Sequence, residues 1–269
     1  MPTHPPLVLF VHVPKTGGTT LHSILSGQLN GIFVESMEHA ESSIGSLGES
    51  EFAQLELVGG HVPYGLHEFV QRPVKYVTML RDPVRRVVSH YWFVRNDPSH
   101  YLYRAVIDGD LSLRQYAEGG CRLSAEIENG QVWMFSARAR RLECADRESL
   151  EEAKAVLRDR FAVVGTTERF DESVVAMQRV LGLRPPVYVR QNTGPAPRGP
   201  LDSETRTAIE ARNILDTELY TYANELLDTQ IRRMGPRFQR DVDRFRRLNS
   251  AYRALHRIAP PLARLAFER

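Results

Sequence analysis

Short apolar runs alternate along the first two thirds of the chain with longer segments whose apolar residues recur every three or four positions. The short runs are typical of buried strands, and the longer segments are typical of amphipathic helices. The alternation predicts an α/β fold with a parallel sheet flanked by helices. The expected strands lie at residues 7–13, 31–36, 56–62, 74–80 and 161–168, and the expected helices at 19–28, 84–95, 149–160 and 171–181.

The segment 7–25 carries the first candidate binding site. Its apolar run ends at Pro14 and continues as KTGGTT before helical spacing begins. Two glycines let the backbone turn sharply, so that N–H groups and a helix N-terminus converge on an anion, and Lys15 adds a positive charge. The segment predicts a turn that binds phosphate or sulfate. A plain tight turn at Gly17 and Gly18 is the alternative.

The order of residues in this turn separates it from two common nucleotide-binding loops. The loop of nucleoside triphosphatases, GxxxxGK[ST], places its lysine after the glycines, whereas Lys15 precedes Gly17 and Gly18. The dinucleotide-binding pattern GxGxxG is also absent from the turn. The sequence therefore argues against both of these nucleotide-binding classes.

A second candidate site lies at residues 76–95. An apolar strand is followed by Arg81, and the next two residues, Asp-Pro, suit the cap and the first position of a helix. Because carboxyl ends of parallel strands share one sheet edge, we expect Arg81 beside the Lys15 turn. Ser89 lies about two helical turns further on. The pair predicts a site for a second phosphate; an Arg81–Asp82 ion pair with an ordinary polar Ser89 is the alternative.

Length and charge set limits on the whole molecule. The chain has 269 residues, 42% of them hydrophobic, which is enough to bury one substantial core. We expect one domain over residues 1–232 and an amphipathic helical extension over residues 233–269. The formal net charge is only +2, and we expect no nucleic-acid partner. Lysine occurs only at positions 15, 75 and 154, which makes Lys15 a distinctive choice in an arginine-rich chain.

PKTGGTT after the first strand and LRDPVRRVVSHYWFVR after a later strand resemble the paired cofactor signatures of sulfotransferases that use 3'-phosphoadenosine 5'-phosphosulfate. The pattern is most similar to the heparan and uronyl 2-O-sulfotransferase branch and its bacterial relatives, and it is specific over residues 7–95. The resemblance implies that Arg81 and Ser89 hold the 3'-phosphate. It implies that the 5'-phosphosulfate is held by Lys15, Thr16, Gly17, Gly18, Thr19 and Thr20.

The resemblance also implies a mechanism, in which an acceptor hydroxyl attacks sulfur in line with the leaving group. Positioning and electrostatics would accomplish this transfer, and we expect no metal. Lys15 would neutralise charge on the leaving phosphate oxygen. His61 matches the GHV element whose histidine is taken as the base in the resembling 2-O-sulfotransferases. Those enzymes have a further histidine where this chain has Gly59, so a shared two-histidine mechanism does not follow.

Other titratable residues are weaker candidates for the base. We expect His12, within the first strand, and His90, on the helix after Arg81, to have packed or structural roles. The remaining weaker histidines are His22, His39 and His67. Other sulfotransferase branches use a glutamate, and the reserve candidates here are Glu35, Glu38 and Glu41.

The segment 187–201 is rich in proline and glycine and predicts a loop after a short strand. Related enzymes close a basic loop over the nucleotide at this place in the chain. Thr193 and Arg198 are therefore candidates to contact the 3'-phosphate or the adenine. A plain surface linker is the alternative.

The segment 233–269 predicts an amphipathic helix with an arginine-rich outer face, ended by Pro260 and Pro261. We expect its apolar stripe to dock on the core or on another subunit, and its arginines to face solvent. Binding of a membrane surface or an anionic glycan is the alternative. The apolar stripe consists of Phe238, Val242, Phe245, Leu248, Tyr252 and Leu255.

The predicted function is transfer of a sulfuryl group from 3'-phosphoadenosine 5'-phosphosulfate to a hydroxyl acceptor on a saccharide, with release of adenosine 3',5'-bisphosphate. Two rivals stay open. A kinase would use the same cradle, but it needs Mg²⁺ and a carboxylate to hold it, and the GK[ST] order is missing. A noncatalytic nucleotide- or polyanion-binding protein would keep Lys15 and Arg81 without requiring His61.

Cysteine content and the N-terminal sequence bear on the compartment. Cys121 and Cys144 are too few for a disulfide framework, and whether they form one bridge is open. The N-terminus lacks a basic region followed by a long apolar core, so we expect a cytoplasmic protein. Animal enzymes that modify secreted glycans are commonly membrane-anchored, and we therefore expect a bacterial source or a shortened chain.

Overall fold

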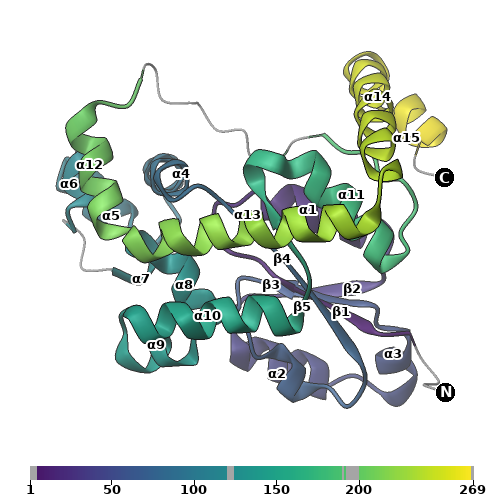
Figure 1. Ribbon diagram of the computed structural model, residues 1–269, viewed down its shortest axis with the longest axis horizontal. Coiled ribbons are helices and arrows are strands. Elements are labelled where there is room, and N and C mark those ends of the chain that lie inside the picture. The colour runs from purple at the N-terminus through teal and green to yellow at the C-terminus, as the bar shows by residue number, and fades with distance from the viewer. Residues whose placement is uncertain (1–4, 120–123, 190, 192–199, 268–269) are drawn as a thin grey trace.

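A five-stranded parallel sheet forms the centre of the computed structural model, which describes residues 5–119, 124–189, 191 and 200–267. The strand order is β2-β3-β1-β4-β5 (Figure 1). The predicted α/β fold with a parallel sheet is therefore confirmed. The strands are β1 (Leu7–Val11), β2 (Gly31–Val34), β3 (Leu57–Gly60), β4 (Val74–Leu80) and β5 (Phe161–Thr166).

Helices connect the strands, as the sequence periodicity predicts. Those of the first half are α1 (Gly18–Ser26), α2 (Met37–Gly45), α3 (Glu49–Gln54), α4 (Pro83–Asn96), α5 (Tyr103–Asp108), α6 (Leu113–Ala117), α7 (Ser124–Ile127) and α8 (Gly130–Phe135). Those of the second half are α9 (Ala137–Leu142), α10 (Arg147–Arg160), α11 (Phe170–Leu181), α12 (Ser203–Arg212), α13 (Ile214–Met234), α14 (Arg237–Ile258) and α15 (Pro260–Phe267). The short 3-10 helices are η1 (Leu66–Phe69) and η2 (Thr167–Arg169).

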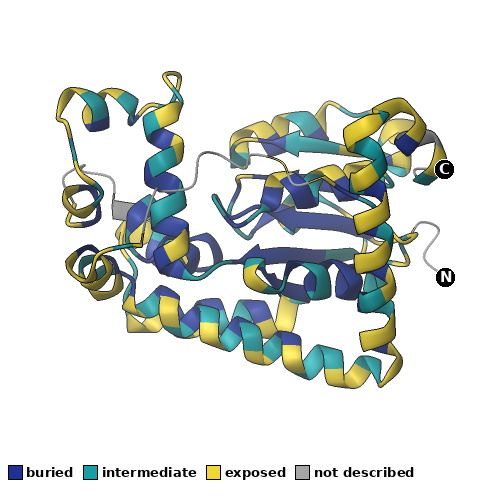
Figure 2. Cartoon of the chain, turned by 90° about the horizontal axis from the view of Figure 1, so that it is seen from above, coloured by how far each residue is buried: buried dark blue, intermediate teal, exposed yellow. Residues whose placement is uncertain are grey.

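Alternate side chains of β1 enter two apolar cores, one on each face of the sheet. Leu7, Leu9 and Val11 join the core that includes residues of α2, α8, α10 and α13. Val8 and Phe10 join the core that includes residues of α1, α11 and α14. Figure 2 shows the strands as a dark blue, buried centre between partly exposed helices. Burial on both faces explains why the strands are continuous apolar runs rather than alternating ones.

Helix α4 begins as the sequence predicts and leads away from the sheet. The side chain of Asp82 accepts a hydrogen bond from the N–H of Arg85 at 2.8 Å, and Pro83 is the first helical residue. The apolar side of α4 packs with α5, α6 and α12 in a third core, at the left of Figure 1. This helical group stands beside the carboxyl end of β4.

The apolar stripe of α14 packs into one of the two cores of the sheet. Phe238, Val242 and Phe245 are buried there, next to α11. The sequence predicts that this stripe docks either on the core or on another subunit, and the structure shows it docked on the core of the same chain. Pro260 follows the end of α14, as predicted, but it also begins α15, because proline fits the first position of a helix. The domain boundary after residue 232 stays a prediction.

The short strand predicted at the start of segment 187–201 is absent, since residues 187–189 have no regular secondary structure. The two preceding prolines lack an N–H group, and the N–H of Tyr188 donates to Asn249 Oδ1 on α14 at 2.8 Å instead of to a strand. Thr193 and Arg198 lie outside the described residues. Cys121 does too, whereas Cys144 is exposed.

The buried carboxylate of Asp216, on α13, binds the first turn of α8, and α8 in turn binds the residue that follows β4. Asp216 accepts hydrogen bonds from the N–H groups of Gln131 at 3.0 Å and Val132 at 2.9 Å, and it lies 3.6 Å from the Arg86 guanidinium. Burial raises the pKa of Asp216, while Arg86 and these N–H groups oppose that shift. The side-chain amide of Gln131 bonds both to the N–H of Arg81 at 2.9 Å and to its carbonyl at 2.8 Å. Helix α13 thereby fixes the backbone of Arg81.

Replacing Asp216 by Ala should destabilise the fold by about 3 kcal/mol, because the buried Arg86 charge and two backbone N–H groups lose their acceptor. Urea unfolding measures the change. Glu225→Ala, on the exposed side of the same helix, is the matched control and should cost less than about 0.5 kcal/mol. Equal midpoints for the two variants would contradict the role given to Asp216.

Candidate active site

The turn after β1 is a left-handed bend that leads directly into α1. Lys15 has a φ of 66° and Gly17 a φ of 80°. Helix α1 begins at the next residue, Gly18, and its first turn contains no acidic side chain. The positive end of the helix dipole is therefore unopposed by its own first turn. The turn has the geometry that the sequence predicts for an anion site.

Threonine hydroxyls lock this turn to its neighbours. The hydroxyl of buried Thr16 donates to a carbonyl three residues earlier at 2.8 Å. Thr167, immediately after β5, donates to the carbonyl of Thr16 at 2.6 Å and lies 3.1 Å from the last carbonyl of β4. Thr20 Oγ1 accepts the N–H of Gln191 at 3.1 Å, whereas Thr19 is exposed. The ends of β1, β4 and β5 are thus joined at the turn.

Gly18 makes room for a buried imidazole. A Cβ atom at this position would lie 1.8 Å from Cδ2 of His12, which follows β1 and is 5% exposed. The ring of His12 lies 4.2 Å from the ring of His61, centroid to centroid. Burial first, and then the neighbouring His61, His22 and Lys15, lower the pKa of His12 to about 2. This buried environment agrees with the packed role predicted for His12. The two glycines meet different requirements, because Gly17 adopts a left-handed conformation and Gly18 leaves space for the His12 ring.

Lys15 and Arg81 lie together, as their places at the ends of β1 and β4 predict. Arg81 Nη1 donates to the carbonyl of Lys15 at 2.9 Å. Arg81 forms an ion pair with Glu168 at 4.0 Å, while Asp82 caps α4. The alternative of an Arg81–Asp82 ion pair is therefore not observed. Burial first, and the charge of Arg81 second, lower the pKa of Lys15 to about 8. Two cations therefore flank the turn.

Ser89 lies half-buried in the second turn of α4. Its helix starts two residues after Arg81, so both residues belong to the same strand–helix unit. The contribution of Ser89 to a phosphate site stays a prediction.

His61 lies just past the carboxyl end of β3, on the side of β1 opposite Arg81. Its ring contacts His12 and lies 5.5 Å from the ring of Phe33, and the residue keeps an exposed side. Partial burial lowers the pKa of His61, with Glu35 and Glu126 opposing the shift. The imidazole is therefore neutral near pH 7 and can accept a proton.

The other candidate bases occupy different surroundings. His22 lies on α1 with its ring 4.9 Å from that of Phe33, and a Cβ at Gly59 would lie 3.6 Å from its Cδ2. His67 Nδ1 lies 3.0 Å from the Tyr76 hydroxyl. Glu35 follows β2 and influences the pKa of His61, as noted above. The candidates on α2, which are Glu38, His39 and Glu41, are all exposed.

An aromatic surface from α4 and the following loop faces Lys15. The Lys15 ammonium lies 3.9 Å from the centroid of the Phe93 ring. Phe93 meets the ring of His100 at 5.5 Å, and His100 stacks on Tyr101 at 4.7 Å. Phe93 is 38% exposed and Tyr101 60%. The sequence did not single out these three residues, which we call the aromatic wall.

His100 of the aromatic wall also belongs to a second group, in which the donor atoms of His90, His100 and Glu126 lie within 4.8 Å of one another, close enough for a metal ion. Glu126 already lies 2.9 Å from His90 Nε2, while His90 Nδ1 lies 2.6 Å from the Tyr116 hydroxyl. Burial opposes ionisation of Glu126, but hydrogen bonds from His90 and Tyr101 lower its pKa to about 2. Glu126 Oε2 is nevertheless buried and has no hydrogen bond of good geometry among the described residues. His90 itself is buried, in line with a structural role. The expectation of a metal-free site stays a prediction.

A sequence model of the galactose-3-O-sulfotransferase family matches residues 56–259, which is most of the chain. The chain therefore belongs to this sulfotransferase family. The two cofactor signatures predict a sulfotransferase, and this prediction is confirmed. The matched region includes Arg81, His61 and the whole C-terminal helix α14, whereas the Lys15 turn precedes it.

Individual relatives are similar over part of their length. Heparan sulfate 2-O-sulfotransferase 1 of Mus musculus is 29% identical over 132 residues, which span 45% of this chain and 36% of that protein. Heparan-sulfate 6-O-sulfotransferase 2 of Gallus gallus is 25% identical over 268 residues, spanning 82% and 66%. The solved structure of mouse sulfotransferase SULT7A1 complexed with PAP covers 94% of this chain and 85% of its own, with 11% identity and a TM-score of 0.39. The chain thus spans well under two thirds of the first relative.

Replacing Gly18 by Ala should force the His12 ring away from the turn, because the new Cβ would overlap it. We expect a loss of about 1–3 kcal/mol in unfolding free energy and a changed chemical shift of His61 in the NMR spectrum. Gly45→Ala, at a helical position with open space, is the control. An unchanged His61 signal in a stable Gly18→Ala protein would show that the contact is dispensable.

Proposed function

We propose that the protein transfers a sulfuryl group from 3'-phosphoadenosine 5'-phosphosulfate to a hydroxyl group of a saccharide. The observation that carries this proposal is the meeting of Lys15, Arg81 and His61 at one edge of the sheet. Lys15 and Arg81 are joined by the 2.9 Å hydrogen bond to the Lys15 carbonyl, and His61 reaches the same turn through His12 and Gly18. Membership in a sulfotransferase family supports this assignment.

The described residues fit a donor with two separate anionic groups. The Lys15 turn and the N-terminus of α1 would hold the 5'-phosphosulfate. Arg81 would hold the 3'-phosphate, with Ser89 as a second hydrogen-bond donor. Arg81 Nε is buried and has no hydrogen-bond partner among the described residues, because its ion pair with Glu168 is 4.0 Å long and therefore too long for a hydrogen bond. This fit favours the phosphosulfate donor over a nucleoside triphosphate.

The chemistry assigned to each side chain follows from its protonation state. The acceptor oxygen would bond to sulfur while the bond between sulfur and the bridging oxygen of the 5'-phosphate breaks. Neutral His61 would accept the proton of the acceptor hydroxyl. Lys15, with a pKa of about 8, remains mostly charged at pH 7 and would stabilise negative charge on the departing oxygen.

The acceptor class rests on two supports. The matching family model and the relatives carry the names of galactose and heparan sulfate sulfotransferases, which are saccharide-modifying activities. The aromatic wall beside Lys15 presents flat, partly exposed rings of the kind that pack against the apolar face of a sugar. A saccharide seated on Phe93 and Tyr101 would lie next to the transferring group.

Adenosine 3',5'-bisphosphate should raise the melting temperature, and ATP at the same concentration should raise it far less. The reason is that the second binding group, Arg81, is matched by a 3'-phosphate. At about a hundred times its Kd, the bisphosphate should add roughly 2.7 kcal/mol of stability. Differential scanning fluorimetry with and without EDTA measures this effect. Equal stabilisation by ATP, or stabilisation that requires Mg²⁺, would favour the kinase alternative.

Replacing His61 by Ala should lower kcat/KM by about 10²- to 10⁴-fold, because the acceptor proton loses its base, while affinity for adenosine 3',5'-bisphosphate stays unchanged. In the unsubstituted enzyme the acid limb of the pH profile should fall below pH 6.5, because the pKa of His61 is lowered and the base protonates only at lower pH. His256→Ala, on α14, is the matched control. Full turnover by His61→Ala would move the base to another residue.

A further inference from the structure

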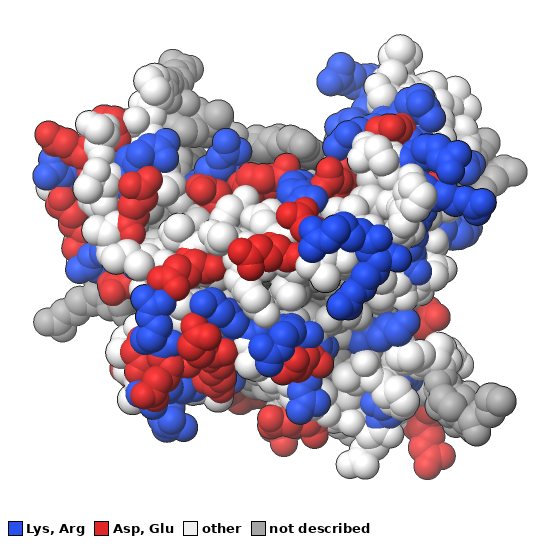
Figure 3. Space-filling model, viewed as in Figure 1, with Lys and Arg blue, Asp and Glu red and all other residues white. Residues whose placement is uncertain are grey.

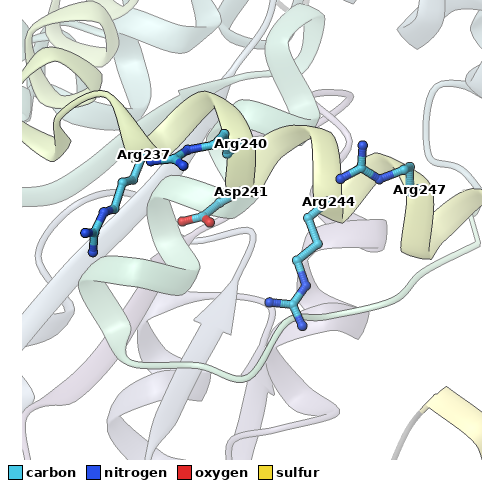
Figure 4. A pocket seen from close by; sticks show the side chains of 5 residues that line it. All are labelled: Arg237, Arg240, Asp241, Arg244 and Arg247. Atoms are coloured by element: carbon cyan, nitrogen blue, oxygen red, sulfur yellow. The ribbon is translucent and has the colours of Figure 1, made fainter.

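The outward face of α14 carries a row of arginines that is independent of the sheet-edge site. Figure 4 shows these side chains around a shallow surface hollow, together with Asp241. They lie three or four residues apart on the face opposite the buried Phe238, Val242 and Phe245, and all are exposed. The row, which we call the arginine row, consists of Arg237, Arg240, Arg244 and Arg247.

The charges of the arginine row have no acidic partners in the described part of the chain. Helix α14 contains seven arginines and two aspartates. Asp241 is taken by Arg179 of α11, and Asp243 lies 4.0 Å from Arg246. Figure 3 shows the resulting concentration of blue side chains around α14 at the upper right. Four like charges along one face repel one another, so an anionic surface would be attracted to this face.

The same face of α14 becomes apolar toward its C-terminus. At 100° per residue, Ala251 and Ile258 continue the line of Arg240 and Arg244. Ile258 is 85% exposed, more than any other large apolar side chain of the described residues, and Leu262 on α15 is 58% exposed. A basic row therefore continues into an exposed aliphatic tip.

We propose that this face of α14 and α15 attaches the protein to a bilayer that contains anionic lipids. The arginine row would contact headgroup phosphates, and Ile258 and Leu262 would enter the headgroup–acyl boundary. A soluble anionic glycan would account for the arginines but not for the exposed aliphatic tip, and a symmetric second copy would bring two arginine rows together. No helix in the described ranges is long and apolar enough to span a membrane.

Vesicle sedimentation of the full chain tests the proposal. Vesicles of phosphatidylcholine with phosphatidylglycerol should retain the protein, pure phosphatidylcholine vesicles should not, and raising salt from about 0.1 M to about 0.5 M should weaken binding. The double variant Arg240→Glu/Arg244→Glu should reduce vesicle partitioning at least about tenfold. Ile258→Ser should reduce the binding that persists at high salt.

A matched pair of charge reversals controls for net charge. Arg104→Glu/Arg206→Glu changes the same number of exposed arginines, on α5 and α12, and should leave vesicle partitioning near that of the unsubstituted chain. Thermal unfolding of each variant checks that the fold is kept. Equal losses for both pairs, capture by a heparin column without vesicle binding, or self-association through this face without vesicle binding would each overturn the proposal. None of these readouts requires sulfuryl transfer, so they are distinct from the tests of the proposed function.

Discussion

The close approach of two cations, Lys15 and Arg81, is the constraint around which the edge of the sheet is built. Burial lowers the pKa of both groups, and the charge of Arg81 lowers the pKa of Lys15 further. The arrangement persists because the left-handed conformation of Lys15 turns its carbonyl toward Arg81, which donates to it at 2.9 Å. A carbonyl dipole thus compensates part of the repulsion in the free protein. An anion placed between the two side chains would offset the remaining repulsion, so the arrangement favours binding of a negatively charged ligand.

Elements far along the chain keep this edge in place. Helix α13 acts through Asp216 and Gln131 on the backbone of Arg81, and Thr167 ties the turn to the ends of β4 and β5. Helix α14 holds the segment before the 192–199 region, since Asn249 binds the N–H of Tyr188. The C-terminal helices are therefore part of the scaffold of the candidate site, although the site residues themselves come from the first third of the chain.

The sequence predicted the parts of this structure that are local. The five strands, the turn at Lys15 and the capped start of α4 follow from apolar periodicity, from glycine and proline placement, and from the carboxyl-edge rule for parallel sheets. The prediction of a short strand before residue 190 was wrong, because Asn249 of α14, which is remote in sequence, accepts a hydrogen bond from the backbone there. The contact between the rings of His12 and His61 and the aromatic wall were missed for a related reason. Each depends on contacts between segments whose relative placement no local pattern specifies.

One contact described above limits how the site can be used. The ammonium group of Lys15 rests on the face of Phe93, and a ring face has room for one partner at a time. While Lys15 lies there, that face of the aromatic wall is covered by a cation. A ligand that draws the ammonium toward the turn uncovers the ring. The occupancy of the anion site and the accessibility of the wall are therefore linked through a single side chain, and by reciprocity a molecule seated on Phe93 would favour Lys15 in its anion-facing position.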